Sequence, residues 1–236
     1  MRSFRILMAV LFALGAGVIA GSQLDVSSAQ RDSNSAATQL RASVAAFPKD
    51  IRAETGNRLP EIKREDLDEA AKKLYDARRP NGAYGPGAIR LYSPAVEQYM
   101  GEVNDYLRHK SGLDPRLVEL AILVTAREMD CEYVWTQHEA AGLKAGLSEE
   151  TIDAVKYRKA LNGVGEKEAT IIELGRESIG KRRVSSETAA HALSLFGNQG
   201  VVNLASLMGD YASTAILLST FDQHVRPTDK PLLPLP

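Results

Sequence analysis

The sequence has a single cysteine, few aromatic residues and no excess of either charge, with 29 Lys and Arg residues against 30 Asp and Glu residues. Because the chain is nearly neutral, its charge gives no reason to expect a nucleic-acid partner. It also lacks a basic stripe with interleaved aromatic residues and a glycine-rich phosphate loop. A single cysteine cannot form an intrachain disulfide, so Cys131 is a structural thiol, a reactive thiol or half of an intermolecular disulfide.

The first thirty residues have the layout of a secretory signal peptide. Arg2 and Arg5 precede an apolar run from Ile6 to Ala20, and small polar residues follow. The run is shorter than the ~20 residues that span a bilayer. We expect cleavage after Ala20 or, with a slight preference, after Ala29. The mature protein is then periplasmic or secreted with no stable membrane anchor, and an uncleaved anchor is the alternative.

The remaining chain is long enough for one domain with a well-buried core. Its composition divides it into a signal peptide (1–29), a flexible linker and arm (30–60), a helical domain (61–227) and a Pro-rich tail (228–236). The linker is rich in Ala, Ser, Gln and Asn. Within this division, residues 48–60 are interpreted as an ordered arm.

Helix signals dominate from residue 61 onward, and no alternating strand of useful length is present. An amphipathic helix is predicted from Glu61 to Arg79. Further helices are predicted to begin at Pro94, after Asp114, after Ser148 and after Ser185. Glycines at positions 112, 146, 163 and 197 stand where helices should end. The sequence therefore predicts an all-α fold.

The segment Pro80–Gly87 has the composition of a loop. It is either a plain connector or a cover over a pocket that contributes Tyr84 to substrate binding.

The most informative stretch runs from Glu119 to His138 and contains the pattern E-x11-C-x6-H. We interpret Asp130 as the N-cap of a second helix that starts at Cys131. Cys131 and His138 are about two helical turns apart and share one face. The same face carries the apolar side chains of Val134 and Trp135. If the two helices fold back on each other, an acid, a thiol and an imidazole surround one small site.

Two of these residues are candidates for acid–base chemistry. Glu119 lies in an apolar helix, where an unpaired carboxylate is costly, so it needs a partner or a proton. It is either a proton carrier or a member of a surface salt bridge with Arg116 or Arg127. His138 exchanges protons near neutral pH with little perturbation.

The third candidate, Cys131, should have a lowered thiol pKa because the dipole of its helix favours the thiolate. The alternative is a small buried hydrophobe. We expect no metal, since zinc usually takes more ligands at closer spacing, and no other cofactor. Trp135 is expected to line the pocket or a subunit contact, and Tyr133 to pack in the core.

This pattern resembles the carboxymuconolactone decarboxylase and alkylhydroperoxidase D superfamily over residues 93–224. The matching residues are Glu119, Cys131, Tyr133, Trp135 and His138. The peroxidase branch has Cys-x-x-Cys, whereas Val134 occupies the second cysteine position here, so the motif is more similar to the decarboxylase-type branch. The resemblance implies a bundle of helical hairpins that assembles as a homotrimer or homohexamer.

The apolar composition of residues 203–221 agrees with such an assembly, because a helix that is apolar nearly all round must be buried on nearly all sides.

Three functions follow from the resemblance. The first is a cofactor-free enzyme in which Glu119 and His138 relay protons on a small lactone or a keto or hydroxy acid, with Cys131, Val134 and Trp135 as the pocket wall. The second is an alkylhydroperoxidase that uses the thiol of Cys131 and an external reductant. The third is a non-enzymatic helical binding protein.

Overall fold

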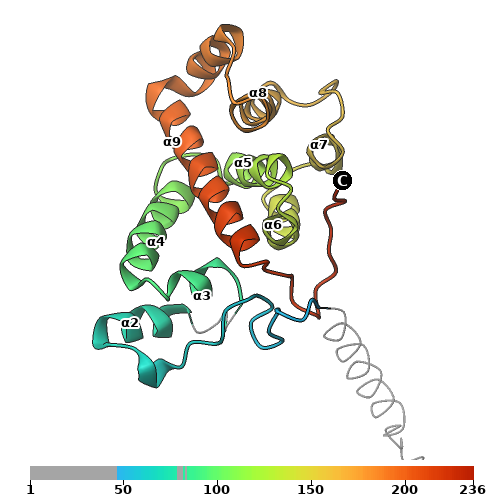
Figure 1. The fold of residues 1–236 in the computed structure, drawn as a ribbon. Helices are drawn as coiled ribbons and strands as arrows, with labels where there is room; N and C mark the ends of the chain where they lie inside the picture. The colour runs from blue at the N-terminus through green and yellow to red at the C-terminus, as the bar shows by residue number, and fades with distance from the viewer. Residues whose placement is uncertain (1–46, 79–81, 83) are drawn as a thin grey trace, which may run out of the picture. The chain divides into compact units, whose positions relative to one another are not determined.

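The computed structural model describes residues 47–78, 82 and 84–236, all of which belong to one unit spanning residues 42–236. The predicted signal peptide and the linker up to residue 46 lie outside the described residues. The described part is all-α, as predicted, and its only β-type pairing is an isolated bridge between Arg52 and Asn57 (Figure 1).

The helices are α2 (Glu69–Arg78), α3 (Pro86–Arg90), α4 (Pro94–His109), α5 (Pro115–Glu128), α6 (Glu132–Lys144), α7 (Glu149–Lys156), α8 (Glu166–Gly175) and α9 (Ser186–Thr220). Four starts were correctly predicted, those of α4, α5, α7 and α9. The predicted helix from Glu61 is wrong at its start, because the Asp68 carboxylate caps the Ala71 amide N–H at 2.7 Å and α2 begins only at Glu69. A short 3-10 turn, Arg64–Asp66, precedes it.

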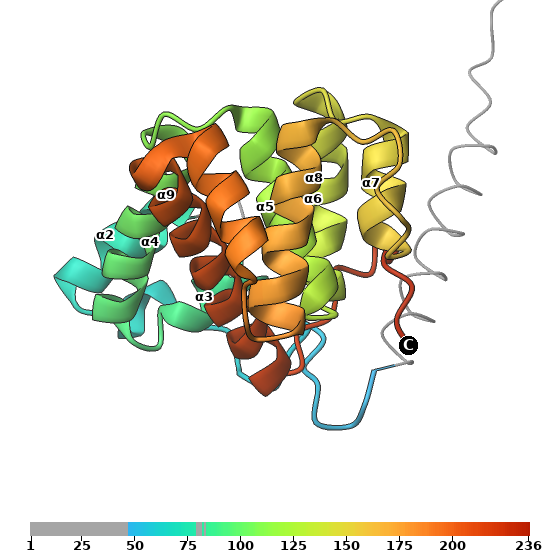
Figure 2. The ribbon, with the colours of Figure 1, turned by 90° about the horizontal axis from the view of Figure 1, so that it is seen from above.

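Helix α5 is the centre of the bundle, and every residue from Leu117 to Arg127 is buried. In Figure 1 it is seen nearly end-on between α9, α8 and α6. Figure 2 shows α4 and α9 on one side of it and α6, α7 and α8 on the other. A helix surrounded in this way can be apolar all round. A polar side chain on α5 is therefore buried and must find its partners inside the fold.

Helix α9 is longer than the predicted segment 203–221 and contains a kink at Gly197, whose φ of 65° favours glycine. Its length and composition would allow it to cross a membrane, and half of its most apolar window is buried in this fold. Val202 and Ile216 remain exposed. Burial of this face against another subunit stays a prediction.

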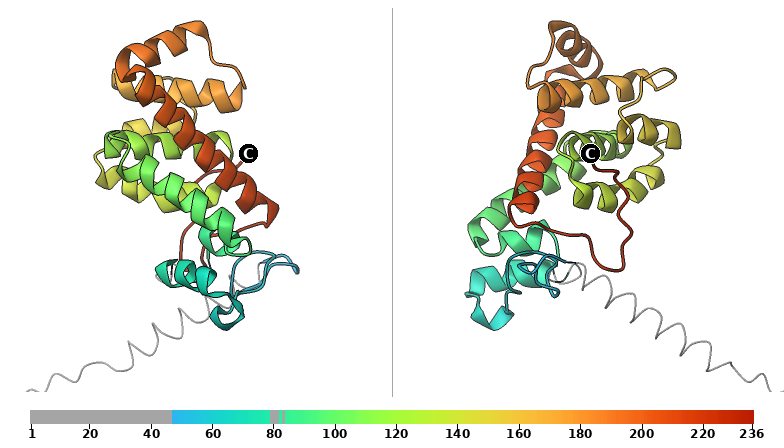
Figure 3. Two further views of the ribbon diagram at one scale, coloured as in Figure 1. Left: turned by 90° about the vertical axis from the view of Figure 1, so that its left-hand side faces the viewer. Right: turned by 45° about the vertical axis from the view of Figure 1, so that its right-hand side comes forward.

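The segments before α2 and after α9 pack against each other at one end of the bundle (Figure 3). The Arg58 amide N–H donates to the Phe221 carbonyl at 3.0 Å, and the His224 N–H donates to the Gly56 carbonyl at 2.8 Å. Asn57 joins the two segments through a side-chain hydrogen bond to Gln223. The arm is thus held beside the C-terminal end of α9, and the chain continues into a tail whose Leu233 is buried.

Candidate active site

A cavity of about 290 Å³ lies between the arm, α3, α4, α6 and α9. Its polar lining includes side chains from four helices, namely Arg90, Asn104, Arg108, His138, Tyr211 and Thr214. Tyr84, Tyr133 and Val134 contribute apolar wall. The cavity is small and mixes apolar surface with a few polar groups, as small-molecule sites do.

The structure brings Glu119 and His138 together beside this cavity. The Glu119 Oε2 atom lies 2.8 Å from Nδ1 of His138, and its Oε1 atom lies 3.2 Å from the Arg108 guanidinium. Glu119 is 8% exposed, so this is a buried carboxylate with two partners. The predicted alternative, a surface salt bridge to Arg116 or Arg127, is wrong. Arg116 pairs with Asp114 and Glu168, and Arg127 with Asp130.

The surroundings favour an ionised Glu119. Burial opposes ionisation, but the hydrogen bond from His138, the charge of His138 and the charge of Arg108 together hold the pKa of Glu119 below its usual value. Because Nδ1 of His138 faces Glu119, Nε2 is the ring nitrogen left for a ligand in the cavity. The ring of Tyr211 packs edge-on against the imidazole, with 5.3 Å between centroids. The histidine is therefore held in place from two sides.

The tyrosines of the wall stay protonated. Burial raises the pKa of both Tyr133 and Tyr211 to about 12. Tyr133 packs in the hydrophobic core, as expected, and also lines the cavity. Tyr84 also lines it, as the loop interpretation proposed, and its hydroxyl donates to the Ala53 carbonyl at 2.9 Å. The Tyr84 ring, rather than its hydroxyl, is thus offered to a ligand.

Cys131 differs from its expected place. Asp130 is not the N-cap of α6, because its φ of 47° places it in the left-handed region and its carboxylate pairs with Arg127 and Arg158. Cys131 itself is the N-cap residue. The expected fall in its pKa is also wrong, since burial raises the pKa of the thiol and outweighs the lowering by the Val134 and Tyr133 amides. The thiol is not part of the cavity lining.

Trp135 does not line the cavity either. It is fully buried, its indole N–H donates to the Glu139 carboxylate, and the Lys156 ammonium lies 5.7 Å from its ring centroid. Val134 and Trp135 are consecutive residues on α6, so their side chains leave the helix in different directions. Val134 reaches the cavity, whereas Trp135 is directed toward α7. The expected place of Trp135 in the pocket lining is therefore not found at this cavity.

Known proteins resemble this chain both in sequence and in fold. Residues 94–177 match the model of the Carboxymuconolactone decarboxylase family. A solved structure described as the alkylhydroperoxidase AhpD core, an uncharacterized peroxidase-related protein from Ralstonia eutropha JMP134, has the same fold. It aligns with a TM-score of 0.59 and 15% identity, over 73% of this chain and 93% of that chain. Curated protein sequences give no match.

The family match over residues 94–177 and the shared fold support the resemblance of this chain to the carboxymuconolactone decarboxylase and alkylhydroperoxidase D-like superfamily. Arg108, Glu119 and His138 lie within the segment that matches the family model. Tyr84, Arg90, Tyr211 and Thr214 lie outside it and complete the cavity.

Sequence reasoning missed several of these cavity residues. Arg108 was overlooked because nothing in its local pattern indicates that it reaches across to α5. Tyr211 and Thr214 lie on α9, far along the chain from the motif. Arg90 lies at the end of the short helix α3, whose first residues fall within the segment that was predicted to be a loop. Among the described residues, no group of three His, Cys, Asp or Glu side chains is placed to hold a metal ion.

Proposed function

We propose that this protein is an acid–base enzyme that moves protons on a small lactone or a keto or hydroxy acid bound in the cavity. The observation that carries the proposal is the 2.8 Å contact between Glu119 Oε2 and His138 Nδ1 at the cavity wall. An ionised Glu119 accepts the Nδ1 hydrogen and fixes the tautomer that presents Nε2 to the ligand.

The dyad supports proton transfer in both directions. A neutral His138 can take a proton at Nε2 from a carbon next to a carbonyl, and Glu119 stabilises the imidazolium that forms. The imidazolium can then return the proton. A decarboxylation starts instead from the imidazolium form of His138, which carries a proton on Nε2. The carbon–carboxylate bond breaks, CO2 leaves, and the electrons of that bond enter the conjugated carbonyl. The Nε2 proton then passes to carbon, and solvent returns a proton to Nε2 for the next turnover.

Arg108 has a supporting part in this proposal. Its guanidinium contacts the second oxygen of Glu119 and also lines the cavity. By holding the carboxylate in one orientation, it keeps Oε2 directed at His138. We therefore describe Arg108 as a positioning residue.

The thiol route of an alkylhydroperoxidase is the alternative within the same superfamily. It needs an accessible thiolate and, in the two-cysteine form, a resolving thiol. In this chain Val134 stands in place of the second cysteine, and Cys131 is buried with a raised pKa. These observations favour the acid–base proposal.

Two substitutions test the proposal on the first substrate found in a screen of small lactones, keto acids and hydroxy acids. His138→Ala and Glu119→Gln should each lower kcat/KM by ~10²-fold or more, since positioned proton transfer typically contributes ~10²–10⁴. The control is His109→Ala, which changes an exposed histidine on α4. Activity of both variants within a few-fold of wild type, with unchanged circular dichroism, would remove the dyad from the mechanism.

A further inference from the structure

The cavity contains a second polar feature that the proton-transfer dyad does not use. Arg90 stands in the last turn of α3, and Thr214 faces it from α9. Arg90 is only 8% exposed, yet it lines the cavity. Since the dyad lies on α5 and α6, Arg90 approaches the same space from a different wall.

The hydrogen-bonding capacity of Arg90 is largely unused by the protein. A guanidinium has five N–H donors. Within the described residues, its side chain donates to one acceptor, the Thr214 hydroxyl at 2.5 Å, and no carboxylate oxygen lies within 4.0 Å of it. This leaves a buried cation with spare donors beside an open space.

The nearby acid does not neutralise Arg90 by contact. Asp210 is the carboxylate whose charge acts on it, but its Oδ2 accepts a hydrogen bond from Asn104 at 2.8 Å. Burial raises the pKa of Asp210, although the charge of Arg90 acts in the opposite direction. A buried charge without a paired partner is costly, and arginine does not escape the cost by losing its proton.

The other charged side chains around the cavity have partners of their own or stand exposed. Arg108 is matched by Glu119. The cationic group of Arg226 lies 5.5 Å from the ring centroid of Tyr84. Glu61 is the one acidic residue in the described lining, and it is exposed. A ligand with a negatively charged group would supply the acceptor that Arg90 lacks.

We infer that Arg90, with Thr214 behind it, is the receptor for a carboxylate group of the substrate. The planar guanidinium fork matches a carboxylate with two parallel hydrogen bonds. The inference rests on the proposed function for the reacting end of the molecule and adds the group that anchors its other end. The substrate class is then a small keto, hydroxy or lactone carboxylic acid. Its carboxylate lies at Arg90 and its reactive carbon near Nε2 of His138.

Both anchor residues lie outside the segment 94–177 that matches the family model. The acid–base pair is inside it. Selection of the substrate would therefore depend on the parts of this chain that flank the family segment.

Calorimetric titration of the mature protein with levulinate, a five-carbon keto acid, tests the inference without needing turnover. Methyl levulinate serves as the neutral probe and inorganic phosphate as the non-carboxylate anion. Levulinate should bind at least ~10-fold more tightly than its ester, because only the carboxylate accepts charge-assisted hydrogen bonds from the guanidinium. It should also bind more tightly than phosphate, which lacks a carbon chain to pack against the apolar wall of the cavity. Equal binding of levulinate and its ester, tighter binding of phosphate, or no levulinate binding at millimolar concentrations would overturn it.

Variants locate the binding. Arg90→Gln should weaken levulinate by ~10-fold or more, whereas the surface control Arg64→Gln, which loses an ion pair with Asp76, should not. Equal effects of the two would overturn the assignment. Arg90→Lys keeps the charge but loses the planar fork, and it covers the case in which Arg90→Gln fails to fold. Its affinity for levulinate should lie between those of the wild type and Arg90→Gln. If Arg90→Lys bound levulinate as tightly as the wild type, the geometry with two parallel hydrogen bonds would be overturned.

His138→Ala separates this inference from the proposed function. It should lose turnover but bind levulinate within ~3-fold of wild type. If levulinate binding survives while the dyad variants keep full activity, the proposed function fails and the receptor stands. If the dyad variants lose activity while the ester binds as well as the acid, the receptor fails alone.

Discussion

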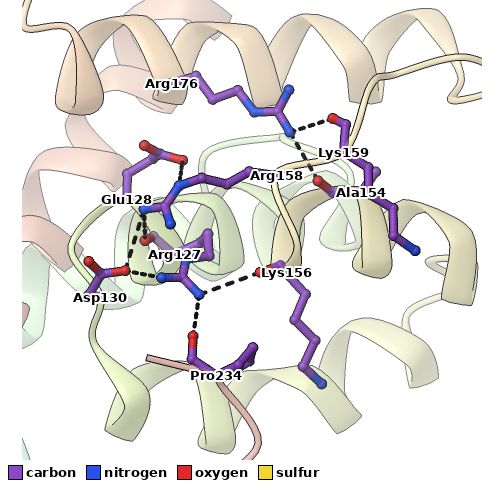
Figure 4. Close-up of polar contacts among 9 residues, drawn as sticks. All are labelled: Arg127, Glu128, Asp130, Ala154, Lys156, Arg158, Lys159, Arg176 and Pro234. Atoms are coloured by element: carbon purple, nitrogen blue, oxygen red, sulfur yellow. Dashed lines mark hydrogen bonds and ion pairs between the residues drawn. The ribbon is translucent and has the colours of Figure 1, made fainter. Parts of the chain in front are cut away.

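The two ends of α5 carry similar sets of charged side chains but differ in what they face. Near its beginning, Glu119 meets His138 and Arg108 beside a cavity. At its end, Arg127 donates to the carbonyls of Lys156 and Pro234 and pairs with Asp130 (Figure 4). One cluster presents donors to empty space, whereas the other is tied to the backbone of α7 and the tail.

The second cluster extends across neighbouring elements in the same way. Arg158 donates to the Arg127 carbonyl and pairs with Glu128, and Arg176 donates to the carbonyls of Ala154 and Lys159 (Figure 4). Carbonyl acceptors fix the positions of these arginines and join the end of α5 to α7 and the start of the π-helical turn Arg176–Gly180. The comparison shows that similar charged clusters can line a cavity or hold backbone segments together, and that the cavity beside the first cluster is what indicates function there.

The largest effect expected from this comparison is on stability at the second cluster. Arg127→Gln removes a buried cation, 3% exposed, from two carbonyls and Asp130. The free energy of unfolding should fall by about 2–3 kcal/mol, because hydrogen bonds to charged groups contribute ~1.5–3 kcal/mol. In urea denaturation this appears as a lower midpoint, while kcat/KM per folded molecule stays within ~3-fold. A large loss of activity at full stability would contradict the division into two roles.

A smaller stability effect with a defined pH dependence is expected at the first cluster. The folded pKa of Glu119 lies below its ordinary value of 4.5, so its contribution is present above pH 4.5 and is lost as the pH falls through the folded pKa. Glu119→Gln should therefore be less stable than wild type by about 1–2 kcal/mol at pH 7. The gap should narrow below pH 4.5. A gap that is constant with pH would show that Glu119 is not held ionised.

The smallest effect is expected at Cys131, which lies between the two clusters in sequence. The thiol is buried, has a raised pKa and is not part of the cavity lining. Cys131→Ala should keep kcat/KM within ~3-fold of wild type on the acid substrate. The same variant should leave any consumption of organic hydroperoxide unchanged. Loss of hydroperoxide consumption in this variant alone would favour the thiol mechanism.

The sequence predicts much of the fold because its helix signals are local. Asp114, Ser148 and Ser185 cap the helices that they were predicted to cap, each through its own side chain. The motif spacing also places Glu119 and His138 correctly, since two antiparallel neighbouring helices bring these positions together. The prediction that Asp130 caps α6 was wrong because an aspartate before a helix fits both an N-cap and a left-handed turn. Its pairing with Arg127, which the local sequence does not reveal, decides between the two.

The rest of the site depends on contacts between residues far apart in the chain. Thr214 faces Arg90 across 124 positions, and Asn104 reaches Asp210 across 106. No local periodicity encodes such pairs. The direction of Trp135 was equally undetermined, because a short helix can offer a large side chain to either neighbour until packing is known.

The most direct test of the central claim is the tautomer of the His138 ring. A long-range proton–nitrogen NMR spectrum of the mature protein, recorded where the histidine is neutral and assigned with His138→Ala, reports which ring nitrogen carries hydrogen. An ionised Glu119 at 2.8 Å from Nδ1 predicts an Nδ1–H tautomer in wild type and its loss in Glu119→Gln. A wild-type ring protonated on Nε2, or one that Glu119→Gln leaves unchanged, would contradict the account.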